Sequence, residues 1–134
     1  MGIIKNGDKK RNFSLSARLK SIKHAFRGLA TLLRYEHNAR IHLFILVIVL
    51  VMGTLLRISE TDWIAILLVS GVVFISECFN SAVEYVSDVV TEEQNDNIKK
   101  AKDVAAAGVL ISAIISIITG VVVFLPELLR LIKR

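Results

Sequence analysis

Apolar and polar positions divide the 134 residues into three long apolar blocks, each bounded by polar segments. The blocks read "IHLFILVIVLVMGTLL", "WIAILLVSGVVFIS" and "VAAAGVLISAIISIITGVVVFL", and they begin at Ile41, Trp63 and Val104. A helix of about 20 apolar residues crosses the hydrocarbon core of a bilayer. The pattern therefore predicts an all-α integral membrane protein with spans over about 38–56, 63–84 and 104–125, the last of them ended by Pro126.

Residues 14–35 show a different pattern, in which apolar residues recur every three or four positions and Arg or Lys occupies much of the remaining wheel. It predicts an amphipathic basic helix, capped at Ser14 or Ser16, that lies in the membrane interface. The alternative is a soluble helix packed on a core, although the chain offers no soluble core. We interpret 14–125 as one domain, with a polar tail over 1–13, a polar loop over 91–103 and a C-terminal tail over 126–134.

The net charge of +5 is unevenly distributed, because residues 1–40 hold ten Lys or Arg against only Asp8 and Glu36. Such a segment is typical of proteins that bind nucleic acid or an anionic membrane surface. The apolar blocks favour the membrane, and we expect no nucleic-acid partner. Cations before a first span indicate that the N-terminus is cytoplasmic. A single cysteine, Cys78, excludes an intrachain disulfide bond within these residues.

The second apolar block runs into "SECFNSAVEYVSD", whose Glu77, Asn80, Glu84 and Asp88 fall on one helical stripe about 80° wide. Counting inward from Asp62 places Glu77 inside the apolar slab, Glu84 at its boundary and Asp88 among the headgroups. An acid within the membrane is costly and is normally turned toward protein or water, which makes it a functional candidate.

Other polar residues are expected at the same level as this stripe, with Glu36 before the first span and Lys102 and Asp103 before the third. Carboxylates are suitable Mg²⁺ ligands, a lysine can meet phosphate charge, and a buried carboxylate can accept a proton from a lipid hydroxyl. These are the parts that phosphoryl transfer requires. A proton or cation transporter is an alternative, but a proton path does not need Glu36 or Lys102. A structural scaffold would leave the acids unexplained.

The segments "ECFNSAVEYVSD" (77–88) and "AKDVAAAGVLI" (101–111) resemble the signature of the prokaryotic diacylglycerol kinase family, which includes undecaprenol kinases. The signature is close to E-x-x-N-[ST]-A-[IV]-E-x-x-x-D followed by A-K-D-x-[AG]-[AS]-[AG]-x-V-L, and each defined position is met. "YEHNARIH" (35–42) resembles the family's upstream element. The likeness covers roughly residues 14–125.

The resemblance implies a homotrimeric enzyme of the bacterial cytoplasmic (inner) membrane, with three spans and a surface helix in each chain. Such an enzyme transfers the γ-phosphate of ATP to a lipid alcohol, with Mg²⁺ as cofactor. Glu77 would be the general base, Asn80 would position the reacting groups, and Glu36 and Glu84 would bind the metal. ATP contacts are implied for Arg18, Lys20, His24, Glu36, Glu84, Asp88, Asn95, Lys102 and Asp103, and lipid contacts for Glu77 and Ala106. We expect His37 and His42 to anchor the first span rather than bind metal.

The resemblance leaves two acceptors open. Diacylglycerol, which would give phosphatidic acid, is the family default and our first prediction. Undecaprenol is the alternative, because the residues Glu36, Asn38, Arg40 and His42 look more like that branch, whereas the Asn80–Ser81 step looks like the diacylglycerol branch.

Overall fold

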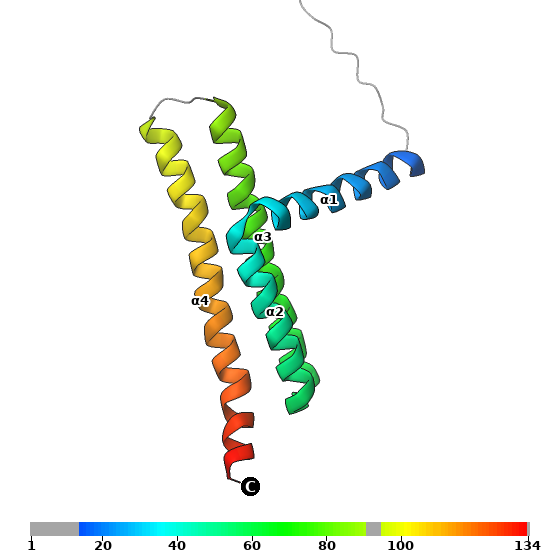
Figure 1. Ribbon diagram of the computed structural model, residues 1–134, viewed down its shortest axis with the longest axis vertical. Coiled ribbons are helices and arrows are strands. Elements are labelled where there is room, and N and C mark those ends of the chain that lie inside the picture. The colour runs from blue at the N-terminus through cyan, green and yellow to red at the C-terminus, as the bar shows by residue number, and fades with distance from the viewer. Residues whose placement is uncertain (1–13, 91–94, 134) are drawn as a thin grey trace, which may run out of the picture.

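The computed structural model describes residues 14–90 and 95–133, and these residues form four helices (Figure 1). They are α1 (Leu15–Tyr35), α2 (His37–Leu56), α3 (Glu60–Val90) and α4 (Asp96–Ile132). The last three are long and apolar enough to cross a membrane, so the prediction of an all-α chain with three long apolar helices is confirmed. The predicted polar tail, 1–13, lies outside the described residues.

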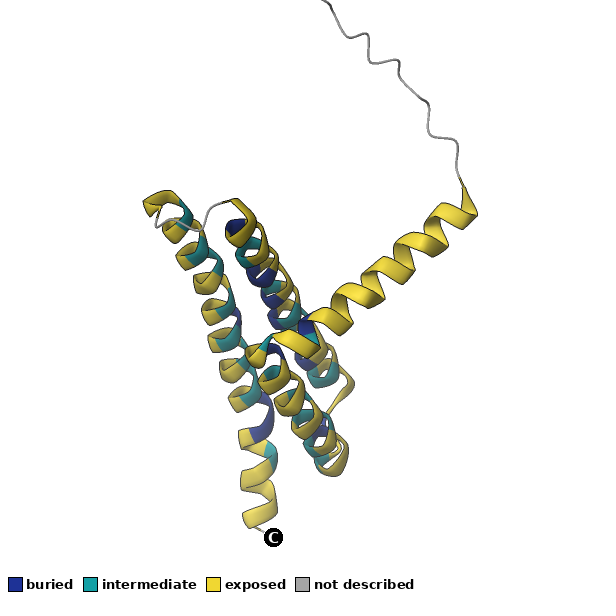
Figure 2. Cartoon of the chain, turned by 45° about the horizontal axis from the view of Figure 1, so that its top comes forward, coloured by how far each residue is buried: buried dark blue, intermediate teal, exposed yellow. Residues whose placement is uncertain are grey.

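Helix α1 meets α2 at Glu36, whose extended backbone (φ −91°, ψ 118°) separates the two helices. Ser14 caps the start of α1, since its hydroxyl accepts a hydrogen bond from the Ala17 N–H at 3.3 Å. From its junction with α2, α1 points away from the other three helices, and most of its side chains are exposed (Figures 1 and 2).

A tight turn joins α2 to α3. Arg57 ends α2 in the left-handed region (φ 53°), a conformation that terminates a helix. Ser59 and Asp62 then start α3 with reciprocal hydrogen bonds. The Ser59 hydroxyl donates to Asp62 Oδ2 at 2.7 Å and accepts from the Asp62 N–H at 3.2 Å. The turn before this capping pair reverses the chain, so α2 and α3 run in opposite directions (Figure 1).

A small apolar core binds α2, α3 and α4 together near this turn. Its buried members are Ile58, Ile66, Val123 and Phe124, with Trp63 packed against them. Gly53 on α2 permits the Trp63 ring to pack closely against α2, because a Cβ at this position would lie only 2.8 Å from that ring. The outward surfaces of the three long helices remain largely exposed (Figure 2), as expected for helices that face lipid or other chains.

Two predicted boundaries are wrong. The third apolar helix does not end at Pro126, because α4 continues to Ile132, so the predicted C-terminal tail, 126–134, is helical as far as Ile132. A proline removes one hydrogen bond, a loss that packing compensates; here Val123 and Phe124 are buried just before it.

The second correction concerns the predicted loop over 91–103. Helix α4 already begins at Asp96, after Asn95 caps it by accepting hydrogen bonds from the Asn97 and Ile98 N–H groups. The polar composition suggested a loop. However, an N-cap residue starts a helix, and the lysines that follow it have a high helix propensity. Residues 91–94 lie outside the described residues.

Candidate active site

The predicted polar stripe of α3 faces the interior of the protein at its deepest part. Glu77 is 1% exposed, Asn80 and Ser81 are also buried, Glu84 is half-buried and Asp88 is exposed. Burial therefore decreases along the stripe in the order in which the sequence predicted membrane depth to decrease. The stripe occupies the last part of α3, from Glu77 to Asp88, just before the helix ends at Val90.

Glu77 lies beside a histidine of α2. His42 Nε2 is 3.2 Å from Glu77 Oε1, within ion-pair distance, although the two groups are not aligned as a hydrogen bond. Within the described residues, three buried side-chain atoms have no hydrogen-bond partner, and they cluster here: Glu77 Oε1, Asn80 Oδ1 and Ser81 Oγ. Buried polar atoms are rarely left unpaired, which indicates a place where a ligand or water completes the bonding.

Two more acids, Glu36 and Glu84, lie near Glu77. The Tyr85 hydroxyl group on α3 donates a hydrogen bond to Glu36 Oε1 at 2.6 Å. This bond connects the α1–α2 junction to α3. Asn80 Nδ2 donates to Glu84 Oε1 at 3.2 Å, one helical turn away. The carboxylates of Glu36 and Glu84 are close enough to Glu77 to act on it electrostatically. The structure thus brings together three acids that the sequence separates by up to 48 positions.

Helix α4 contributes Lys102 to the exposed end of the stripe. Its Nζ lies 2.8 Å from Asp88 Oδ1 and links α4 to α3. Asp103 and Ala106 are exposed on α4. Asn95 uses its side-chain oxygen to cap α4.

The three predicted α1 residues are not brought to the acids within one chain. Arg18, Lys20 and His24 are exposed and lie in the half of α1 that extends away from the bundle (Figure 1). Among the described residues, α1 touches α2 and α3 but not α4.

Glu36 and Glu84 offer carboxylate oxygens, the kind of ligand that a divalent cation such as Mg²⁺ prefers. No group of three or more His, Cys, Asp and Glu able to hold a metal ion occurs in the described part of the chain. Mg²⁺, however, often takes only one or two carboxylates and completes its shell with water and phosphate oxygens. Glu36 and Glu84 each use one carboxylate oxygen in the hydrogen bonds above, which leaves the other oxygen of each for such a cation.

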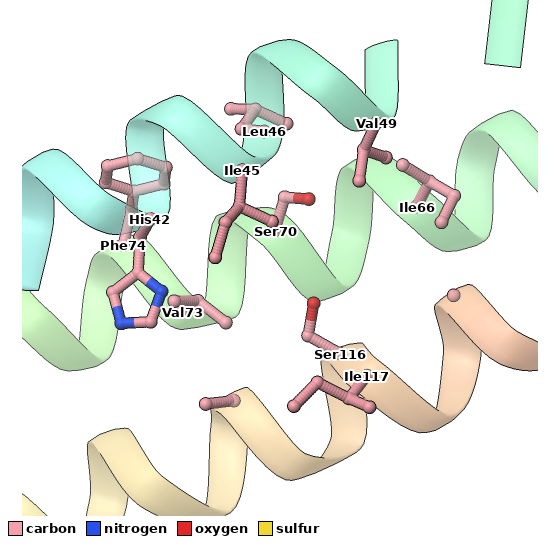
Figure 3. A pocket seen from close by; sticks show the side chains of 12 residues that line it. His42, Ile45, Leu46, Val49, Ile66, Ser70, Val73, Phe74, Ser116 and Ile117 are labelled. Carbon is pink, nitrogen blue, oxygen red and sulfur yellow. The ribbon is translucent and has the colours of Figure 1, made fainter. Parts of the chain in front are cut away.

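A cavity of about 110 Å³ lies between α2, α3 and α4, and His42 lines it (Figure 3). Its other walls are mostly apolar, such as Ile45, Val73 and Phe74, with the Ser70 and Ser116 hydroxyl groups inside. His42 therefore lines this cavity and also lies beside Glu77.

Sequence reasoning missed two partners of the acids. It expected His42 only to anchor the first span, and it assigned nothing to Tyr85. No spacing along one helix signalled these partners, because Tyr85 meets Glu36 and His42 meets Glu77 across helices.

The fold and site define a small helical membrane protein with one buried acid, Glu77, and two half-buried acids, Glu36 and Glu84, near one end of its apolar helices. A family model described as prokaryotic diacylglycerol kinase matches residues 23–124, most of the chain, so the protein belongs to that family.

Two similar proteins support this family assignment. An undecaprenol kinase of Bacillus subtilis (strain 168) is 38% identical over 109 residues, which are 81% of this chain and 89% of the relative. A diacylglycerol kinase of Synechocystis sp. is 36% identical over 114 residues, which are 84% of this chain but 65% of that relative's length. The protein is therefore a lipid kinase, a membrane phosphotransferase with a lipid and ATP as substrates. Family membership favours the enzyme over the transporter and scaffold alternatives.

Proposed function

We propose that the chain transfers the γ-phosphate of ATP to a membrane lipid alcohol, with Glu77 as general base. The observation that carries this proposal is the buried Glu77 carboxylate, 1% exposed and flanked by Glu36 and Glu84. A desolvated carboxylate at this depth is where a lipid hydroxyl group, but not bulk water, arrives.

In this mechanism Glu77 takes the proton of the lipid hydroxyl group as the hydroxyl oxygen attacks the γ-phosphorus. A new P–O bond forms to the lipid, the bond from the γ-phosphorus to the β–γ bridging oxygen breaks, and ADP leaves. Asn80, buried and bonded to Glu84, positions the reacting groups. Glu36 and Glu84 would hold Mg²⁺, which would neutralise charge on the transferred phosphate.

The remaining polar residues bind the nucleotide. Lys102 and Asp103 contact its phosphates, and Asp88 lies toward the nucleoside, as does Asn95. Arg18, Lys20 and His24 reach ATP from α1. Because α1 points away from its own bundle, we assign these last contacts to a neighbouring subunit's site in a homotrimer. Ala106 lines the path of the lipid.

The same proposal orients the protein in a bacterial inner membrane. α1 lies in the interface as an amphipathic basic helix, and the N-terminus is cytoplasmic because ten Lys or Arg precede the first span. ATP then reaches the acids from the cytoplasm.

Two acceptors are proposed. Diacylglycerol, giving phosphatidic acid, follows the name of the family. Undecaprenol is favoured by the similarity to the undecaprenol kinase of Bacillus subtilis, because the match covers 89% of that relative's length. Purified protein with MgATP and each lipid alcohol in mixed micelles decides between them: we expect kcat/KM for one acceptor to exceed the other at least tenfold. Comparable values for both would contradict a single dedicated acceptor.

The decisive variant is Glu77→Gln, which keeps size and hydrogen bonding but removes the base. We expect turnover to fall by about 10²–10⁴-fold while MgATP binding survives. Glu84→Gln should instead raise the Kd for MgATP, measured by calorimetry in detergent. Near-normal turnover of Glu77→Gln would show that another group is the base.

A further inference from the structure

Within the part of the chain that the structure describes, the Glu77 carboxylate has one neighbour able to balance its charge, His42. Among the described residues, the groups that act electrostatically on Glu77 are the acids Glu36 and Glu84 and the imidazole of His42. Two of these three neighbours carry the same charge as Glu77 and repel it. An ionised carboxylate at 1% exposure is expensive unless it is paired. His42 Nε2, 3.2 Å from Glu77 Oε1, is placed to supply that pairing.

We propose that His42 is the positioning residue of Glu77. Its Nε2–H, which lies 3.2 Å from Oε1 without being aligned with it in this structure, turns to donate to Oε1 and then holds the carboxylate in one orientation, which leaves Oε2 free for the lipid hydroxyl group. This inference deepens the proposed function, because it rests on Glu77 being the base. His42 itself touches neither ATP nor the reacting phosphorus.

The positions of the two residues in the bundle support a shared role. Along α2, His42 lies deeper than Glu36, and along α3, Glu77 lies deeper than Glu84. His42 also borders the mostly apolar cavity between α2, α3 and α4 (Figure 3). A hydrogen bond or ion pair gains strength in such surroundings, where water does not screen it. The shallower acids remain for the metal and phosphates, and the deeper pair remains for the proton.

A histidine suits this task because an imidazole N–H can donate in the neutral and in the charged ring. What Glu77 needs from residue 42 is therefore a donor at a fixed distance. A glutamine there also offers an N–H donor, whereas a leucine of similar size offers none. The His42→Gln and His42→Leu variants thus separate positioning from space filling. His37, an exposed histidine at the start of the same helix, provides the matched control.

The first test measures steady-state kinetics with MgATP and the accepted lipid alcohol. We expect His42→Leu to lower kcat by about 10–100-fold with both KM values within about threefold, and His42→Gln to keep kcat within about fivefold. His37→Leu should match the unsubstituted protein. Full kcat in His42→Leu, equal losses in the Gln and Leu variants, or a loss confined to the KM for ATP would overturn the proposal.

The second test does not depend on catalysis. Thermal unfolding in detergent is measured for His42→Leu in the natural background and in Glu77→Gln. We expect a lower midpoint in the natural background, where a buried charge loses its partner, and a shift less than half as large in Glu77→Gln, where no charge is left. Equal shifts in the two backgrounds would show that the residues are not coupled.

The two tests separate the two proposals. If Glu77→Gln keeps its turnover, the base assignment fails, and the unfolding comparison still shows whether the pair exists. If Glu77→Gln is inactive and the His42 variants behave like the control, only the positioning role fails.

Discussion

Single residues of the site differ in what they contribute because they differ in exposure. Glu77 is enclosed, whereas the Asp88–Lys102 ion pair is open to solvent, with 68% and 39% of the two side chains exposed. An ion pair in water adds little to stability. Lys102 is therefore better explained as a cation kept available beside the acids than as a clamp between α3 and α4.

Lys102→Gln tests this interpretation at the residue scale. We expect the KM for MgATP to rise by about tenfold, because one phosphate contact is lost, while the thermal midpoint barely changes. Lys100→Gln, on an exposed position of the same helix turn, is the control and should leave both values unchanged. A large loss of thermal stability without a change in KM would assign Lys102 a structural role instead.

Residue identity predicted the acids well and their partners poorly. The 3.6-residue period was enough to place Glu77, Asn80 and Glu84 on one face of α3. The neighbours of these residues across helices depend on how α2 rotates against α3, and period alone does not encode that rotation. The contacts of His42 with Glu77 and of Tyr85 with Glu36 therefore emerged only from the three-dimensional structure.

At the scale of elements, apolar content predicted the number and order of the long helices but not where they end. Ends are decided by single capping groups, such as Asn95 before α4 and the Ser59–Asp62 pair before α3. The rule that proline ends a helix also places a stop at Pro126, although α4 stays helical to Ile132 beside the apolar core.

The close contact of α2 with Trp63 of α3 gives a prediction for this scale. Gly53→Ala would put a methyl group 2.8 Å from the Trp63 ring and 3.0 Å from Ile58 Cδ1. Overpacking of this kind costs about 1–3 kcal/mol, so we expect a lower unfolding midpoint and altered Trp63 fluorescence. Gly71→Ala, where a Cβ has open space in the chain, should show neither change. An unchanged midpoint in Gly53→Ala would mean that Trp63 moves aside without cost.

For the whole molecule, the single chain supplies the acids but leaves two features unexplained. α1 carries its cations away from them, and the long helices have only 11–28% of their most apolar segments buried. Sequence analysis inferred a homotrimer from the family resemblance alone, because no pattern in one chain specifies which exposed face meets another copy. The proposed homotrimer accounts for both features by seating α1 and these faces against neighbouring subunits.

Subunit mixing shows which residues of a site belong to one chain. Tyr85 ties Glu36 to α3 within the chain, so Glu36, Glu77 and Glu84 should serve the same site. Mixed oligomers of Glu36→Gln and Glu77→Gln chains, co-expressed with different tags and purified on both, then contain no complete set of acids. We expect turnover to stay within a few-fold of the less impaired single variant. Oligomers of unsubstituted and Glu77→Gln chains, the control, should retain activity in proportion to the unsubstituted share. Recovery in the doubly substituted mixture to a substantial fraction of that control would mean that Glu36 reaches a neighbour's Glu77, and that the Tyr85 contact does not define the active site.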